Sequence, residues 1–200
     1  MSSDVIIFDI DSSPSGMRYD QWCIKWWIWL LSIPKSINPA LDLVGNYAST
    51  NQGNNKVFFL CQTIESSKTL PTREIKIPIR GKIFLPIINW ICFKDNEEQT
   101  SEYLKNLAKE KMDRIGKLEL YINDKPVCED LSKYRVQPPI FEMEIPENNI
   151  LGVKPGFTHL VTDGYWIFFE PLIQDIKLSS FGSCSSGITE IGVNYNIKLV

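Results

Sequence analysis

Apolar and polar positions alternate along the C-terminal stretch EIGVNYNIKL, residues 190–199. The apolar members run from Ile191 to Leu199 at every second position, and the positions between them are polar or glycine. A period of two places one set on each face of a β-strand. The stretch therefore predicts a strand with one dry face and one wet face.

The same period recurs upstream of this strand. Residues 74–79 alternate, as do residues 117–122 and 141–145. The nearly continuous apolar run over 82–93 is typical of a strand covered on both faces, and Pro86 within it indicates an edge position or a bulge. Shorter strands are expected at 5–10, 57–64 and 165–169.

Two segments have helical spacing instead. Trp22, Trp26 and Trp29 recur at intervals of four and three within a helix of about residues 18–32. A second, amphipathic helix is expected at about 97–115, with its charged face in solvent.

Eight or nine short strands with no βαβ rhythm predict a mainly β protein. The expected architecture is an antiparallel β-sandwich or jelly roll that forms a single domain over residues 1–200. The N-terminal Trp-rich helix would plug one end or cover one sheet, and the second helix would lie on the surface.

Charge and hydropathy narrow the classes of function. The chain has 21 Lys and Arg against 24 Asp and Glu, a net charge of −3, which argues against nucleic-acid binding. The longest apolar run, about a dozen residues, is shorter than the ~20 that cross a bilayer. The first ten residues do not form a signal peptide. We expect a cytoplasmic protein without a transmembrane segment, or an exported one if a leader precedes Met1.

The cysteine pattern predicts neither a metal site nor a cofactor. The five cysteines at positions 23, 61, 92, 128 and 184 are widely spaced, contain no C-x-x-C pair, and accompany a single histidine, His159. Zinc sites usually bring two ligands together within about four residues. Buried free thiols are the favoured interpretation, with one disulfide or one reactive thiol as alternatives.

Familiar catalytic motifs are missing from the sequence. It contains neither G-x-x-x-x-G-K-[ST] nor G-x-G-x-x-G, and the small-residue stretch 182–187 lacks the spacing of a nucleophile elbow. We therefore predict no catalytic residue and favour a protein that is not an enzyme.

The densest group of chemically useful side chains lies at 159–166. His159, Asp163 and Tyr165 stand where a Pro/Gly-rich loop leads into an aromatic strand, and loops on a β scaffold often carry binding residues. Arg135 and Gln137, on one side of another extended segment, would form the opposing wall. The alternative is that Asp163 only caps a hairpin, Tyr165 only fills the core, and Arg135 only ties down a loop.

The tryptophan cluster also allows several interpretations. Trp22, Trp26 and Trp29 could pack in the core, stack on a sugar or another flat ligand, or anchor an oligomer interface.

Several short motifs follow one another along the chain: SPSG (13–16), YxxW (19–22), WWxW (26–29), LSIP (31–34), NP (38–39), IP (77–78), GK (81–82), PIIN (86–89) and DGYW (163–166). In these motifs the chain resembles a group of archaeal and bacterial proteins of unknown function. The resemblance implies a shared fold and carries over no activity or functional residue. Many members look exported and have extra cysteines where Tyr47 and Ile75 stand here. A disulfide and export are therefore not implied for this chain.

These observations leave three functional hypotheses. The first is a non-enzymatic β-sandwich that binds a small molecule, a sugar or a protein. The second is a hydrolase whose site draws on His159, Asp163, Tyr165, Arg135 and Glu170. The third is a structural subunit that forms a homo-oligomer through the Trp-rich helix.

Overall fold

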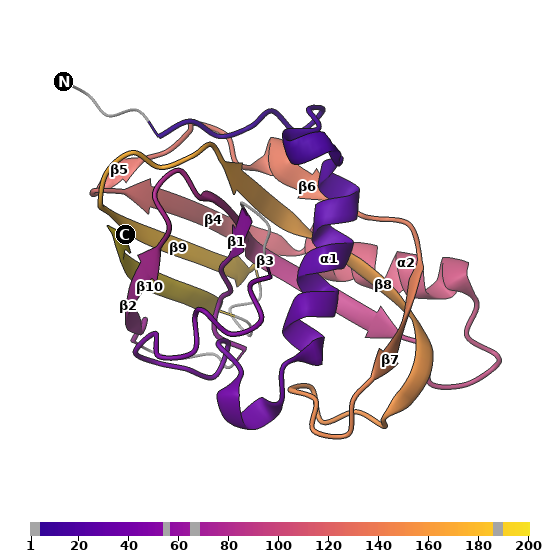
Figure 1. The fold of residues 1–200 in the computed structure, drawn as a ribbon. Coiled ribbons are helices and arrows are strands. Elements are labelled where there is room, and N and C mark those ends of the chain that lie inside the picture. Colours follow the sequence, from indigo (N-terminus) through magenta and orange to yellow (C-terminus); the bar gives the residue numbers. More distant parts are fainter. Residues whose placement is uncertain (1–4, 54–56, 65–68, 186–189) are drawn as a thin grey trace.

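Ten strands and two α-helices make up the described part of the chain, residues 5–53, 57–64, 69–185 and 190–200 of the computed structural model (Figure 1). The first sheet has the order β1-β3-β8-β6, and β7 also pairs with β8. Its strands are β1 (Val57–Phe59), β3 (Lys82–Phe93), β6 (Arg135–Val136), β7 (Phe141–Ile145) and β8 (Gly156–Phe169). The second sheet has the order β2-β10-β9-β4-β5. Its strands are β2 (Thr72–Ile77), β4 (Ile115–Ile122), β5 (Lys125–Pro126), β9 (Ile176–Cys184) and β10 (Glu190–Leu199).

The fold is mainly β, with 39% of residues in strands and 19% in helices, as the alternating patterns predict. Both sheets are mixed, however, which corrects the expectation of purely antiparallel sheets. β1 lies parallel to β3, and β2 lies parallel to β10. After β1 the chain enters the second sheet to form β2, and only then returns to form β3. Such a crossover produces parallel neighbours, whereas a tight hairpin produces antiparallel ones.

Helix α1 (Tyr19–Ser32) covers one face of the first sheet and supplies much of the core (Figure 1). Trp22, Trp26 and Trp29 are only 1%, 2% and 5% exposed. Trp26 meets the ring of Trp166 edge to face, and Trp22 meets Phe168 in the same way. The three rings therefore pack within the chain.

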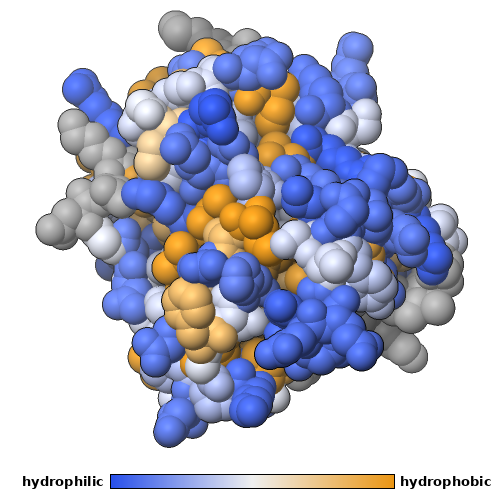
Figure 2. Space-filling model, turned by 90° about the vertical axis from the view of Figure 1, so that its right-hand side faces the viewer, coloured by the Kyte–Doolittle hydropathy of each residue, from blue (hydrophilic) through white to orange (hydrophobic). Residues whose placement is uncertain are grey.

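Helix α2 (Ser101–Asp113) covers the opposite face of β3 and β8. It is shorter than the expected 97–115 because Thr100 caps its first turn, with the Thr100 Oγ1 accepting a hydrogen bond from the Tyr103 N–H. At its other end β4 begins at Ile115. The side of the molecule that carries α2 and β7 is largely hydrophilic, with a small apolar patch near its centre (Figure 2).

Strand β8 lies between the two helices and is buried on both faces from Leu160 onward. It begins at Gly156, well before the expected 165–169, and it runs straight through Asp163 and Gly164. The Asp-Gly pair is therefore strand and not the start of a hairpin. Gly164 is needed because a Cβ atom there would come within 2.5 Å of the Cβ of Asn89 on β3.

Within the described residues, no helix is both long and apolar enough to cross a membrane.

Candidate functional site

The structure brings Arg135 and Asp163 together, but it joins them as a buried ion pair. Arg135 Nη2 lies 2.7 Å from Asp163 Oδ2, and Arg135 Nε lies 3.1 Å from Asp163 Oδ1. The Asp163 side chain is only 2% exposed. Burial raises the pKa of the Asp163 carboxyl, and the neighbouring guanidinium opposes that rise.

The same guanidinium also reaches helix α2. Arg135 Nη1 lies 2.7 Å from Asp113 Oδ1, and Nη2 donates to the Lys109 carbonyl at 3.1 Å. Gln137 makes a parallel link, because its Nε2 donates to the Lys105 carbonyl at 3.0 Å. These hydrogen bonds engage the polar groups of Arg135 and Gln137 in fastening the β6 segment to α2.

Tyr165 is 8% exposed, and its ring lies 6.0 Å from the Arg135 guanidinium. It also lines a polar hollow of about 470 Å³ that includes Cys128 and the start of β4.

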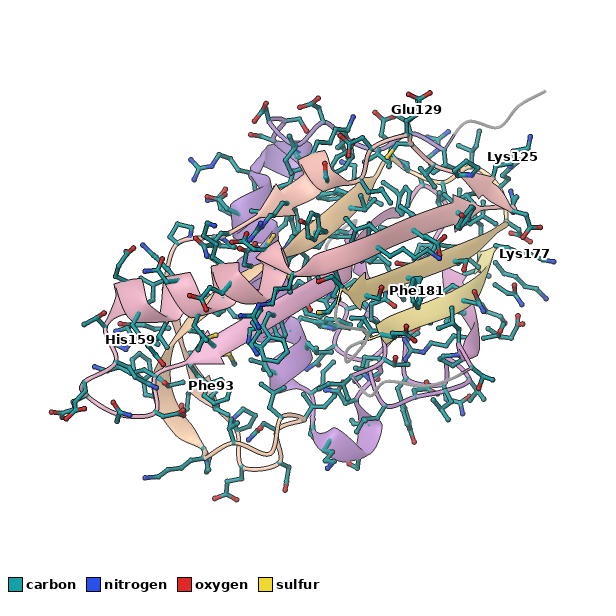
Figure 3. All side chains as sticks on the ribbon, turned by 180° about the vertical axis from the view of Figure 1, so that it is seen from behind. Phe93, Lys125, Glu129, His159, Lys177 and Phe181 are labelled. Carbon is teal, nitrogen blue, oxygen red and sulfur yellow. The ribbon has the colours of Figure 1, made fainter. Side chains whose placement is uncertain are left out.

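His159 stands apart from this cluster. Its Nε2 lies 2.7 Å from Glu142 Oε1 on the neighbouring strand β7, and its side chain is 43% exposed. His159 and Asp163 share a face of β8 but are separated by four residues, roughly 13 Å at about 3.3 Å per residue. Figure 3 shows His159 and Phe93 at one end of the molecule, far from Lys125 and Glu129 at the other. His159 and Asp163 thus do not converge on one point.

A cavity of about 510 Å³ lies elsewhere, beside the second half of β3. Its walls come from α1, from β3 after Pro86, from the end of α2, and from the facing ends of β9 and β10. Three segments outside the helices and strands, at Ala40 and around Thr63 and Val153, complete it. No residue of this cavity was among those the sequence singled out for ligand binding, apart from Trp26 of the Trp-rich helix.

Aromatic rings form the cavity's apolar wall. Trp26 and Trp27 line it from α1, and Trp90 lines it from β3. The Trp26 N–H donates to the Leu60 carbonyl at 2.7 Å, and the Trp27 N–H donates to Thr162 Oγ1 at 2.8 Å. Because these N–H groups are already bonded, the two α1 rings are fixed in position and present apolar surface.

Two amide side chains of the lining each contain one buried atom that lacks a partner. Gln62 lines the cavity and is 5% exposed; its Nε2 donates to Ser180 Oγ at 2.6 Å and to the Pro86 carbonyl at 3.3 Å. Gln62 Oε1 has no hydrogen-bond partner, and neither has Nδ2 of the lining residue Asn89. Both unpaired atoms are closed to solvent, so they do not face the cavity, and each leaves a cost of about 1–3 kcal/mol within the protein.

The charged groups of the lining are both cations. Lys111 and Arg114, from the end of α2, line the cavity, and no described lining residue is a carboxylate. Neither side chain forms an ion pair with a described residue. Lys111 Nζ lies 5.0 Å from the centre of the Trp90 ring. The cavity therefore favours an anionic group near this end of α2.

All five cysteines are free, as the sequence favours. Cys23, Cys61 and Cys92 are buried, while Cys128 and Cys184 are half-buried. Cys184 lines the 510 Å³ cavity and Cys128 lines the polar hollow. Among the residues that the structure describes, no group of three or more acidic, histidine or cysteine side chains is placed to hold a metal ion.

Comparison with known proteins gives no relative: no family model, no curated protein and no solved structure matches the chain. The cavity and its chemistry are therefore the basis on which a function can be assigned.

Proposed function

We propose that this protein is a non-enzymatic binding protein that takes an apolar ligand into the cavity between α1, β3 and the end of α2. The single observation that carries the proposal is the lining of this cavity. Trp26, Trp27 and Trp90 give it apolar walls, and Lys111 and Arg114 are its only charged lining groups among the described residues.

The dimensions and composition of the cavity support the proposal. Pockets that bind small molecules usually measure about 300–1,000 Å³ and combine apolar walls with a few convergent polar groups. The cavity has a volume of about 510 Å³, walls rich in tryptophan, and two cationic residues, Lys111 and Arg114, in its lining. Burying an apolar ligand there contributes roughly 25 cal/mol per Å² of surface removed from water.

The hydrolase alternative receives less support from the geometry. It requires His159 to act beside Asp163, but His159 pairs with Glu142 and Asp163 pairs with Arg135. The general base of a hydrolase must reach the proton that it removes, at a separation of about 3 Å or through one water.

The proposal can be tested with 1-anilinonaphthalene-8-sulfonate, a fluorescent dye that joins apolar aromatic rings to an anionic sulfonate group. We expect saturable binding at one site per chain, with quenching of tryptophan emission. Val153→Trp, which places a bulky ring at the lining position 153, should weaken binding about tenfold or more, equivalent to about 1.4 kcal/mol. The matched control is Ile173→Trp, at a position that is 81% exposed and outside the cavity lining.

Equal binding by the two folded variants would show that the dye binds elsewhere. The proposal would then be wrong. Circular dichroism and thermal melting of both variants establish that each retains the native fold.

A further inference from the structure

Strand β3 has an open edge where it lines the cavity. β1 pairs with β3 only at Lys82, Ile83 and Phe84, whereas β8 accompanies β3 as far as Phe93. Beyond Phe84, the side of β3 that faces away from β8 therefore has no hydrogen-bonded neighbouring strand among the described residues.

The hydrogen-bond alternation identifies the backbone groups on this edge. The Lys94 N–H donates to the His159 carbonyl at 3.0 Å, so Lys94 forms its backbone bonds with β8. Residues of an antiparallel pair alternate between bonding the partner and pointing away from it. Asn89, Ile91 and Phe93 consequently direct their N–H and C=O groups toward the open edge. No described residue outside the sheet ladder forms a hydrogen bond with these backbone groups, and all three residues line the cavity.

Apolar walls lie on both sides of this edge. Ile91 lies opposite Thr162 in the register, and Thr162 Oγ1 accepts a hydrogen bond from Trp27, so this face of β3 lies under α1. Trp90 points to the opposite face, where Lys111 of α2 lies over its ring. A strand added at the edge would send successive side chains alternately toward these two walls.

Gln62 covers this side of β3 only as far as Pro86. Its Nε2 donates to the Pro86 carbonyl at 3.3 Å, just beyond the residues that pair with β1. The open stretch of the edge therefore begins after Pro86.

Charge complementarity defines the rest of the occupant. Lys111 and Arg114 line the same cavity and have no ion pair with a described residue, so a carboxylate on the occupant would find two cations at the end of α2. Extended peptides combine main-chain donors and acceptors, alternating side chains and a terminal carboxylate.

We propose that the ligand is an extended peptide segment that adds to the open edge of β3 as a further strand and places a carboxylate beside Lys111 and Arg114. This inference rests on the proposed function, because it names the occupant of the same cavity. It accounts for the unpaired edge and the two cations together, whereas a small apolar anion would leave the edge of β3 unpaired.

The test uses the full native chain and an equimolar pool of random five-residue peptides with free carboxyl termini. Retained peptides are identified by mass spectrometry and resynthesised with one N-methylated peptide bond at a time. Methylation should weaken binding tenfold or more at every second bond and have little effect at the bonds between, because only alternate N–H groups face β3. The C-terminal amide of the peptide should bind more weakly than the free acid.

Two protein variants locate the site. Ile91→Pro removes one outward N–H while sparing the ladder to β8, and it should weaken the peptide tenfold or more relative to Ile91→Val. Lys111→Gln should weaken the free acid but not the amide, and the control Lys105→Gln, on the same helix outside the lining, should change neither.

The outcomes separate the two proposals. If the anilinonaphthalene dye binds in the cavity but no peptide is retained, the peptide inference is overturned and the proposed function stands. An equal loss at every methylated bond, or loss of the amide in Lys111→Gln, also overturns the inference. If neither dye nor peptide binds, both proposals fail.

Discussion

Arg135 and Asp163 show how one residue pair can resemble a ligand site and serve the fold instead. An ionised carboxylate that is almost completely buried is expensive unless a cation and hydrogen bonds compensate it. Arg135 provides both with its two bonds to Asp163, and it uses two further donors on α2. The pair therefore fastens three elements, β6, β8 and α2.

We predict that Arg135→Gln lowers the free energy of unfolding by about 3 kcal/mol at pH 7. This is the low end of the range for removing the partner of a buried charge, because Arg135 itself is partly exposed. The deficit relative to the native chain should shrink as the pH falls. Without the guanidinium the pKa of Asp163, already raised by burial, rises further, and the protonated carboxyl no longer needs a cation.

Urea unfolding measured from pH 7 to pH 4 checks this prediction. The double variant Arg135→Gln/Asp163→Asn should recover most of the lost stability at pH 7, because it leaves no buried charge. A deficit independent of pH, or a double variant no more stable than the single one, would refute the ion-pair account.

At the scale of elements, α1 and β3 follow from the sequence to different degrees. The tryptophan spacing predicts a helix at 18–32, and α1 spans Tyr19–Ser32. Pro86 predicts a bulge or an edge, and the register of β3 against β8 shifts between Pro86 and Ile88. The open edge could not be predicted, because it depends on where β1 stops pairing. That limit is set by tertiary contacts and not by the pattern within either strand.

The core role of α1 can be measured at Trp26. Trp26→Ala should cost about 3–5 kcal/mol, the usual range for deleting a large buried aromatic side chain. Ile28→Ala, on the same helix at a residue 40% exposed, should change the unfolding free energy by less than about 1 kcal/mol. A near-neutral Trp26→Ala accompanied by loss of an oligomer would instead assign the ring to an interface between chains.

The open edge of β3 predicts a period of two in amide hydrogen exchange. The N–H groups of Asn89, Ile91 and Phe93 should exchange faster than those of Trp90 and Cys92, which are bonded to β8. Residue-resolved NMR exchange on the free protein measures this directly. Uniform protection along 89–93 would show that another part of the chain already covers the edge.

At the scale of the whole molecule, the two sheets share one core and the cavity opens just past a close contact between them. Gly182 of β9 approaches β3 so closely that a Cβ atom there would lie 2.7 Å from the Cβ of Ile88. Beyond this contact, Cys184 of β9 and the later residues of β3 both line the cavity. A glycine at the crossing point is what allows the sheets to meet there.

Much of this arrangement could not be predicted from the sequence. Alternation predicts strands such as β10, but it does not state which strands neighbour one another, so the parallel pairing of β2 with β10 was missed. The cavity residues were missed for a related reason. Gln62 stands in an apolar run and Lys111 on a charged helix face, and only the tertiary fold brings them together. A polar residue within the predicted strand 57–64 was the one signal present.

Cysteine footprinting measures whether a ligand occupies the cavity beside β3. Cys184 lines the cavity and Cys128 does not, and both are half-buried, so the chain contains its own control. The native protein is alkylated with iodoacetamide, with and without the anilinonaphthalene dye at ten times its Kd, and each cysteine is followed by mass spectrometry. We predict that the dye slows alkylation of Cys184 about tenfold, in proportion to occupancy, and leaves Cys128 unchanged. An unchanged rate at Cys184 under saturating dye, or equal slowing of both thiols, would contradict it.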